Sequence, residues 1–221
     1  MLKAIIFDMD GVLIDSISAV WESYSRLLRH EGVTITKAYI RQNLARSLRD
    51  NLTAMREEFG IRDYDPAEFS KASAKIQLEL LAEKKADPHL IALLESARAA
   101  GIVCAVGTSS MRWRAEEILR LLKIRAFFAQ VITADDVERH KPAPDVFLEA
   151  AHRSGVDPKH CVVIEDAGEG ILAAHHAGMK AVGLLTAYHS AEELAHADRV
   201  IGGFSDLSLE LLEDLCKHTV E

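Results

Sequence analysis

Short apolar runs of strand length alternate with helical segments along most of this chain of 221 residues. Such runs cover residues 3–7, 102–106, 131–133, 162–164, 181–185 and 199–201. Strands that are separated by helices pair in parallel, because each helix returns the chain to the same edge of the sheet. The alternation therefore predicts an α/β fold with a parallel-sheet core.

The segment between the first and second predicted strands has a helical pattern. Apolar side chains recur at helical spacing from Ile17 to Leu28, and residues 44–59 and 66–85 are also helical in pattern. We expect an all-helical domain at residues 15–85, inserted into a core domain made of residues 1–14 and 86–221. The crossings near residues 15 and 85 are the expected hinges.

Two carboxylates, Asp8 and Asp10, come directly after the first predicted strand and are followed by Gly11. Ligands of open α/β sheets bind at the carboxyl ends of the strands. Two carboxylates this close repel each other unless a cation binds or one of them holds a proton, and an oxygen-rich site of this kind suits Mg²⁺. Taken alone, the motif is also explained by a solvated turn, because short motifs often match by chance.

Hydroxyl groups follow the second predicted strand, where Thr108, Ser109 and Ser110 lead into a helix that begins near Trp113. The free amides at the start of a helix favour an anion such as phosphate. Ordinary capping of the helix by Ser or Thr is the alternative explanation.

Two further groups stand before the next helices. Lys141 lies in the proline-rich turn of residues 140–145, and Glu165 and Asp166 follow the strand at residues 162–164. Taken alone, Lys141 is explained by a surface lysine and Asp166 by a helix cap. Glu165 differs, because burying its charge directly after three buried β-branched residues costs free energy unless a partner neutralises it. In a parallel sheet all these strand ends lie at one edge. The four groups together therefore indicate a functional site more specifically than any one motif does.

At these residues the chain resembles the haloacid dehalogenase superfamily, whose four motifs match residues 8–12, Thr108, Lys141 and the pair Glu165 and Asp166. The resemblance implies a Rossmann-like core with the helical insertion as a cap domain. It also implies a Mg²⁺-dependent phosphatase that acts on a small phosphorylated metabolite.

The resemblance implies a role for each of these groups. Asp8 is the expected nucleophile and Asp10 the acid and base, while Thr108, Lys141, Ser109 and Ser110 hold the phosphoryl group. The expected metal ligands are Asp8, Asp10 through its main-chain carbonyl, and Asp166, with Glu165 as a direct or water-mediated supporter. Arg49 resembles a cap residue that binds substrate anions. The substrate itself stays open among phosphoglycolate, sugar phosphates and nucleotides.

Three other functions remain as alternatives. Beta-phosphoglucomutases share this core and cap, but the resemblance to them leads us to expect a His in the first cap helix where this chain has Val20. A haloacid dehalogenase needs neither Asp10 nor a metal. A receiver-type phospho-acceptor module is shorter and lacks the insertion.

Charge and cysteine usage limit the partners of the chain. The net charge of −8 argues against binding to nucleic acid or to an anionic membrane. The three cysteines are far apart and form no Cys-x-x-Cys pair. No apolar run is long enough to span a membrane, and acids interrupt the apolar N-terminal stretch, so we expect a cytoplasmic protein. No feature indicates an oligomeric state.

Overall fold

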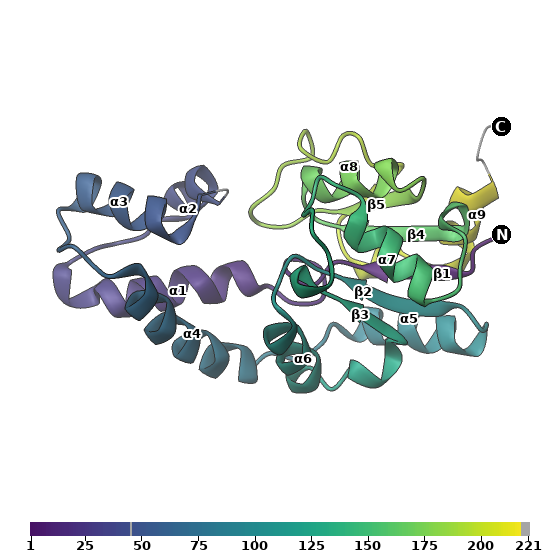
Figure 1. Ribbon diagram of the computed structural model, residues 1–221, viewed down its shortest axis with the longest axis horizontal. Coiled ribbons are helices and arrows are strands. Elements are labelled where there is room, and N and C mark those ends of the chain that lie inside the picture. The colour runs from purple at the N-terminus through teal and green to yellow at the C-terminus, as the bar shows by residue number, and fades with distance from the viewer. Residues whose placement is uncertain (45, 218–221) are drawn as a thin grey trace. The chain divides into compact units, whose positions relative to one another are not determined.

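The computed structural model describes residues 1–44 and 46–217, and it divides into two compact units (Figure 1). The core unit consists of Met1–Ile14 together with Lys85–Glu221, and the helical unit of Asp15–Lys84. Lys85 belongs to the core unit, whereas the sequence pattern placed it in the helical segment.

The core unit is built on a six-stranded sheet in which every neighbouring pair of strands is parallel. The strand order is β3-β2-β1-β4-β5-β6. The strands are β1 (Ala4–Phe7), β2 (Val103–Gly107), β3 (Gln130–Ile132), β4 (Cys161–Glu165), β5 (Lys180–Leu184) and β6 (Arg199–Ile201). The predicted parallel α/β core is confirmed, with strand limits that differ from the prediction by one residue in five of the six strands.

The strand order reverses at β1, which pairs with β2 on one side and with β4 on the other. This is the topological switch point at which α/β sheets open a crevice for ligands. Phe7 lies opposite Val106 of β2 and Ile164 of β4. The residues that follow these three strands therefore emerge at one level of the sheet edge.

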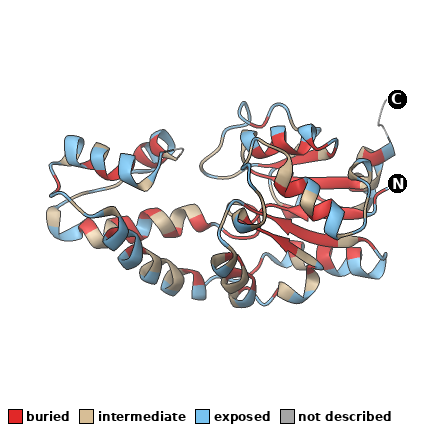
Figure 2. Cartoon of the chain, viewed as in Figure 1, coloured by how far each residue is buried: buried red, intermediate tan, exposed pale blue. Residues whose placement is uncertain are grey.

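Helices cover both faces of the sheet. They are α5 (Pro88–Ala99), α6 (Arg112–Leu121), α7 (Asp145–Arg153), α8 (Gly168–His176) and α9 (Leu209–Lys217), with short 3₁₀ turns at Arg125–Phe127, Ala134–Asp136, Pro158–His160 and Phe204–Asp206. Helices α7 and α8 pack on one face, and α5, α6 and α9 on the other (Figure 1). Because both faces are covered, strands β1–β5 are buried along nearly their whole length, whereas the edge strand β6 buries Ile201 and exposes Arg199 (Figure 2).

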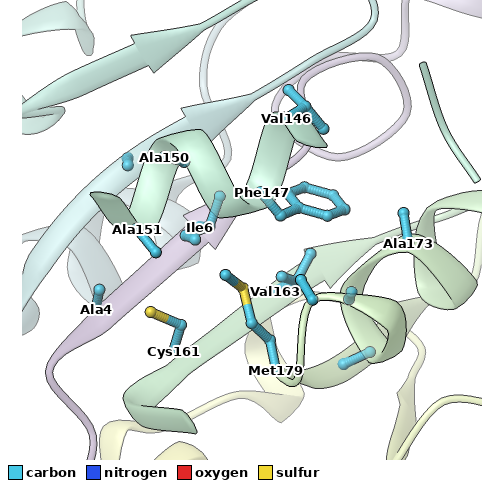
Figure 3. Packing of buried hydrophobic residues seen from close by; sticks show 14 of the residues in the cluster. Ala4, Ile6, Val146, Phe147, Ala150, Ala151, Cys161, Val163, Ala173 and Met179 are labelled. Atoms are coloured by element: carbon cyan, nitrogen blue, oxygen red, sulfur yellow. The ribbon is translucent and has the colours of Figure 1, made fainter. Parts of the chain in front are cut away.

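The core between the sheet and helices α7 and α8 is made of small and medium-sized apolar residues. Phe147 of α7 lies among Ile6 of β1, Val163 of β4 and Met179 at the start of β5 (Figure 3). Gly107 at the end of β2 leaves room for this ring, since a Cβ atom there would lie 2.9 Å from Phe147 Cδ1. The packing holds the carboxyl ends of β1, β2 and β4 close together.

The helical unit contains α1 (Ser16–Leu28), a 3₁₀ turn (Arg29–Glu31), α2 (Lys37–Asn43), α3 (Leu48–Phe59) and α4 (Pro66–Ala82). Helices α1 and α4 pack against each other, and the buried hydroxyls of Ser23 and Ser73 are 2.7 Å apart. A cluster of edge-to-face and tilted aromatic pairs fills the rest of this core.

Two helix starts in this unit differ from the prediction. The helix predicted at residues 44–59 begins only at Leu48, because the Ser47 side chain accepts a hydrogen bond from Asp50 N and caps the helix there. Residue 45 lies outside the described residues, as do residues 218–221 of the core unit. Helix α2 was not predicted.

Within the described ranges no helix is both long and apolar enough to cross a membrane.

Candidate active site

A buried lysine links the ends of three strands in the core unit. Lys141 Nζ donates to Asp8 Oδ1 at 2.5 Å, to Glu165 Oε1 at 2.8 Å and to the Gly107 carbonyl at 3.2 Å. The side chains of Lys141, Asp8 and Glu165 are each less than a tenth exposed. The structure thus brings Asp8 and Lys141 together, although they are far apart in the sequence, because the loop between β3 and α7 carries Lys141 to the end of β1.

The carboxylates at this point carry more charge than the lysine neutralises. Burial raises the pKa of Asp8 well above its ordinary value; Lys141 opposes the rise, and Glu165 and Asp166 add to it. Burial also raises the pKa of Asp166. Burial alone would lower the pKa of Lys141, but Asp8 and Glu165 raise it further than burial lowers it. A bound cation would relieve the remaining repulsion between the carboxylates.

Asp10 lies in the turn after β1 and contacts the loop and helix that follow β2. Ser110 Oγ donates to Asp10 Oδ2 at 2.6 Å, and Arg114 Nη1 lies 3.3 Å from Asp10 Oδ1. Ser110 N in turn donates to Thr108 Oγ1 at 3.0 Å. Two hydrogen-bonding groups from the second strand end therefore orient the carboxylate of Asp10.

Glu165 uses both of its carboxylate oxygens within the protein. Oε1 accepts from Lys141, and Oε2 accepts from Ala167 N at 2.7 Å. The first turn of α8 leaves no space beside this side chain, because a Cβ atom on Gly170 would lie 1.8 Å from Glu165 Oε1. These contacts hold Glu165 in place against Lys141.

Asp166 is buried and lies against the turn that carries Asp10. A Cβ atom on Gly11, whose φ is +91°, would be 1.9 Å from Asp166 Oδ2. Among the described residues, Asp166 Oδ2 has no hydrogen-bond partner. A buried carboxylate oxygen without a partner, beside the backbone of residues 10 and 11, suits a divalent cation bound by oxygen ligands.

His189 is a residue of this site that the sequence analysis missed. Its Nδ1 lies 3.3 Å from Asp166 Oδ2, but the pair does not meet the geometry of a hydrogen bond, and both atoms are buried. Proximity to the Asp166 carboxylate raises the pKa of His189, and burial opposes the rise. No local pattern marks this histidine, because its position depends on the loop between β5 and β6.

Two more contacts were not predicted. His176 Nδ1 lies 3.1 Å from the Pro142 carbonyl and so ties α8 to the loop that carries Lys141. Since a carbonyl oxygen only accepts, Nδ1 carries the proton in this pair. Arg114, described above, is the second; it lies in the first turn of α6.

The two remaining predicted residues are exposed side chains. Ser109 is exposed in the loop after β2, and Arg49 is exposed in the first turn of α3 in the helical unit. Among the described residues no three His, Cys, Asp or Glu side chains are grouped as a metal site. The candidate ligands are two side-chain carboxylates and one main-chain carbonyl, a set that suits Mg²⁺, which keeps its other positions for water and phosphate oxygens.

Comparison with known proteins agrees with this geometry. The haloacid dehalogenase-like hydrolase family matches residues 5–184. The fructose-1-phosphate phosphatase YqaB of Escherichia coli (strain K12) is 36% identical over 179 residues, which cover 80% of this chain and 94% of that protein. The beta-phosphoglucomutase of Bacillus subtilis (strain 168) is 29% identical over 228 residues, which cover 96% of this chain and 95% of that protein.

A solved structure shares the fold over nearly the whole chain. The crystal structure of CbbY from Rhodobacter sphaeroides in complex with phosphate is 26% identical, covers 94% of this chain and 97% of its own, and superposes with a TM-score of 0.77. The family match includes all the strand ends that carry the clustered side chains. This chain belongs to the haloacid dehalogenase-like hydrolase family.

Proposed function

We propose that this protein is a Mg²⁺-dependent phosphatase that hydrolyses a small phosphate monoester through an aspartyl phosphate on Asp8. The observation that carries the proposal is the buried Asp8, which contacts Lys141 at the switch point of the sheet and lies two residues before Asp10. A carboxylate nucleophile, a fixed cation and a second carboxylate are the groups that phosphoryl transfer to an aspartate needs.

In the first step, an Asp8 carboxylate oxygen attacks the phosphorus atom and the bond from phosphorus to the ester oxygen breaks. Protonated Asp10 gives its proton to the departing oxygen, which leaves as an alcohol. In the second step, water attacks the phosphorus of the aspartyl phosphate, Asp10 takes a proton from that water, and the bond to Asp8 breaks. Inorganic phosphate is released and both carboxyl groups return to their starting states.

The phosphoryl oxygens carry negative charge throughout, and fixed donors stabilise it. Lys141 supplies a positive charge, which its short contact with Asp8 holds beside the reacting oxygen. Thr108 Oγ1 accepts from Ser110 N, so the Thr108 hydroxyl hydrogen is available to a phosphoryl oxygen. Ser109 and the backbone amides that follow Thr108 complete the proposed phosphate site.

The proposed Mg²⁺ ligands are the Asp8 and Asp166 carboxylates and the Asp10 main-chain carbonyl. When bound, the ion offsets the charge of the carboxylates and of the phosphate. Because Lys141 and Ala167 N already occupy both oxygens of Glu165, we assign Glu165 to positioning Lys141 rather than to direct coordination.

Phosphorylated sugars are the proposed substrate class, since two of the relatives are named for enzymes of phosphorylated sugars. The helical unit is the proposed cap domain, with hinges near residues 15 and 85. Arg49, exposed at the start of α3, is the proposed contact for a substrate anion.

The proposal is tested with purified protein, p-nitrophenyl phosphate and a series of sugar phosphates that includes fructose 1-phosphate. Phosphate release is expected with Mg²⁺ and is expected to stop in EDTA, in Asp8→Asn and in Asp10→Asn. Trapping of labelled phosphate on the wild-type protein, and not on D8N, identifies the intermediate. Turnover by D8N at the wild-type rate would rule out Asp8 as the nucleophile.

A phosphosugar mutase is the second candidate, because the Bacillus subtilis beta-phosphoglucomutase covers nearly all of this chain. Conversion of glucose 1-phosphate to glucose 6-phosphate in the presence of a sugar bisphosphate separates the two functions. We expect release of inorganic phosphate to be faster than isomerisation, since the first helix carries Val20 at the position where the resemblance to beta-phosphoglucomutases leads us to expect a histidine.

A further inference from the structure

A loop between β5 and β6 carries a histidine to the candidate metal site. The backbone amides of Tyr188 and His189 both donate to Thr186 Oγ1 at 3.3 Å, which folds the loop on itself just before the imidazole. Further along, Leu194 is fully buried in the core cluster. The loop is therefore docked on both sides of His189.

The same loop lies directly on the beginning of α8. A Cβ atom on Gly168 would be 2.9 Å from the Glu193 carbonyl oxygen, so the loop and the helix are in close contact two residues after Asp166. Ser190 N donates to Glu193 Oε2 at 2.6 Å, which closes the short turn that follows His189. The position of the imidazole relative to Asp166 is set by this packing.

Asp166 Oδ2 is close to two groups of the core unit. One is the backbone of Gly11, and the other is His189 Nδ1 at 3.3 Å. The nitrogen and the oxygen are both buried and make no aligned hydrogen bond. At a separation of 3.3 Å, a small rotation of either side chain is enough to align the nitrogen with the carboxylate oxygen.

We propose that His189 is a positioning residue for the metal ligand Asp166. Its Nδ1–H holds one carboxylate oxygen and so fixes the orientation in which Asp166 meets Mg²⁺. The inference rests on the proposed function, which places Asp166 among the ligands. Metal-bound carboxylates are commonly held by a second hydrogen-bonding partner, and loss of such a partner weakens metal binding by about 10-fold to 100-fold.

Isothermal titration calorimetry with Mg²⁺ tests the role without an activity measurement. His189→Ala is expected to weaken Mg²⁺ binding by at least about 10-fold. His189→Asn is expected to bind within about 3-fold of wild type, because the Asn amide nitrogen stands near the position of Nδ1. His189→Gln carries the same group one methylene further out and is expected to bind as weakly as His189→Ala.

His196 offers a matched control, because it lies in the same loop and is exposed. His196→Ala is expected to bind Mg²⁺ as wild type does, and Asp166→Asn is the reference for a lost ligand. The comparison of H189N with H189Q stays informative even where H189A does not fold. Circular dichroism shows which variants are folded.

The outcomes separate the inference from the proposed function. Equal Mg²⁺ affinity in wild type, H189A and H189Q, with weaker binding in D166N, would overturn the role of His189 and leave the metal site intact. Weak binding by both H189N and H189Q would also overturn it, because the donor would then not be what matters. Wild-type affinity in D166N, or the absence of Mg²⁺ binding by wild type, would remove the metal assignment and the inference with it.

Discussion

Replacement of Lys141 by methionine is expected to destabilise the metal-free protein strongly. Lys141 Nζ contacts Asp8 at 2.5 Å and Glu165 at 2.8 Å, and the lysine side chain is only 8% exposed. Methionine keeps most of the aliphatic stem but lacks Nζ, so it also loses the cation–π contact with the Phe147 ring, whose centroid is 4.6 Å from Nζ. The variant therefore leaves two buried carboxylates without their cation.

The cost follows from that geometry. Removing one partner of a buried ion pair destabilises a protein by about 3–5 kcal/mol, because the remaining charge is buried without compensation. A chain of this size loses about 2–4 °C of unfolding temperature per kcal/mol, so Lys141→Met is expected to unfold about 6–20 °C below wild type. The loss is expected to be smaller at acidic pH, where Asp8, whose pKa is already raised by burial, takes up a proton.

Thermal unfolding in EDTA, followed by circular dichroism, measures the effect. Lys159→Met is the matched control, because Lys159 is 61% exposed and its ion pair with Asp157 at 2.9 Å lies at the surface. That control is expected to change stability by no more than about 0.5 kcal/mol. The double variant K141M/E165Q removes one of the stranded charges and is expected to recover part of the loss. Unfolding of K141M within about 2 °C of K159M would refute the reasoning.

Three further predictions concern the same cluster. Saturating Mg²⁺ is expected to raise the unfolding temperature of wild type, since a ligand at 100 times its Kd stabilises by about 2.7 kcal/mol, and to raise that of D166N less. Gly170→Ala is expected to cost about 1–3 kcal/mol in calorimetry and to slow turnover, because its Cβ would displace Glu165 from Lys141. In EDTA, Asp8→Asn is expected to unfold above wild type, by a margin that grows as the pH rises above 3.8, because burial disfavours ionised Asp8.

For each of these three predictions, a specific result would contradict the reasoning. An equal Mg²⁺ shift in D166N would show that Asp166 does not hold the ion, and full activity of Gly170→Ala would show that Glu165 moves without consequence. For Asp8→Asn, the sign follows from the raised pKa in the folded state, so wild type loses stability as Asp8 ionises. A margin that stays constant with pH would contradict that assignment.

Much of the core unit could be predicted because its strands are buried on both faces. A strand covered on both sides, such as residues 162–164, is a continuous apolar run that ends where the first polar residues appear. Asp8 and Glu165 could be assigned to one cluster for the same reason, since parallel strands end at one edge. Lys141 lies in the loop between β3 and α7, so its place in the cluster also depends on the path of that loop.

The contacts that were missed all depend on loops and helix starts. His189 reaches Asp166 only because the loop between β5 and β6 folds over the start of α8, and no periodic pattern encodes that path. Ser110 was expected to bind the phosphate, and the structure shows that its hydroxyl also orients Asp10. Helix α2 is short, and its seven residues contain too few apolar positions for helical spacing to be evident.

The central position of β1 has a consequence for how the chain is made. Residues 4–7 leave the ribosome before both of their neighbours, because β1 pairs with β2 at residues 103–107 and with β4 at residues 161–165. The helical unit consists of residues 15–84 alone, so its core can form while β1 still has no neighbouring strand. The strand that precedes Asp8 thus has to await both of its partners, so the Asp8 carboxylate is enclosed only after residues 161–165 have been made.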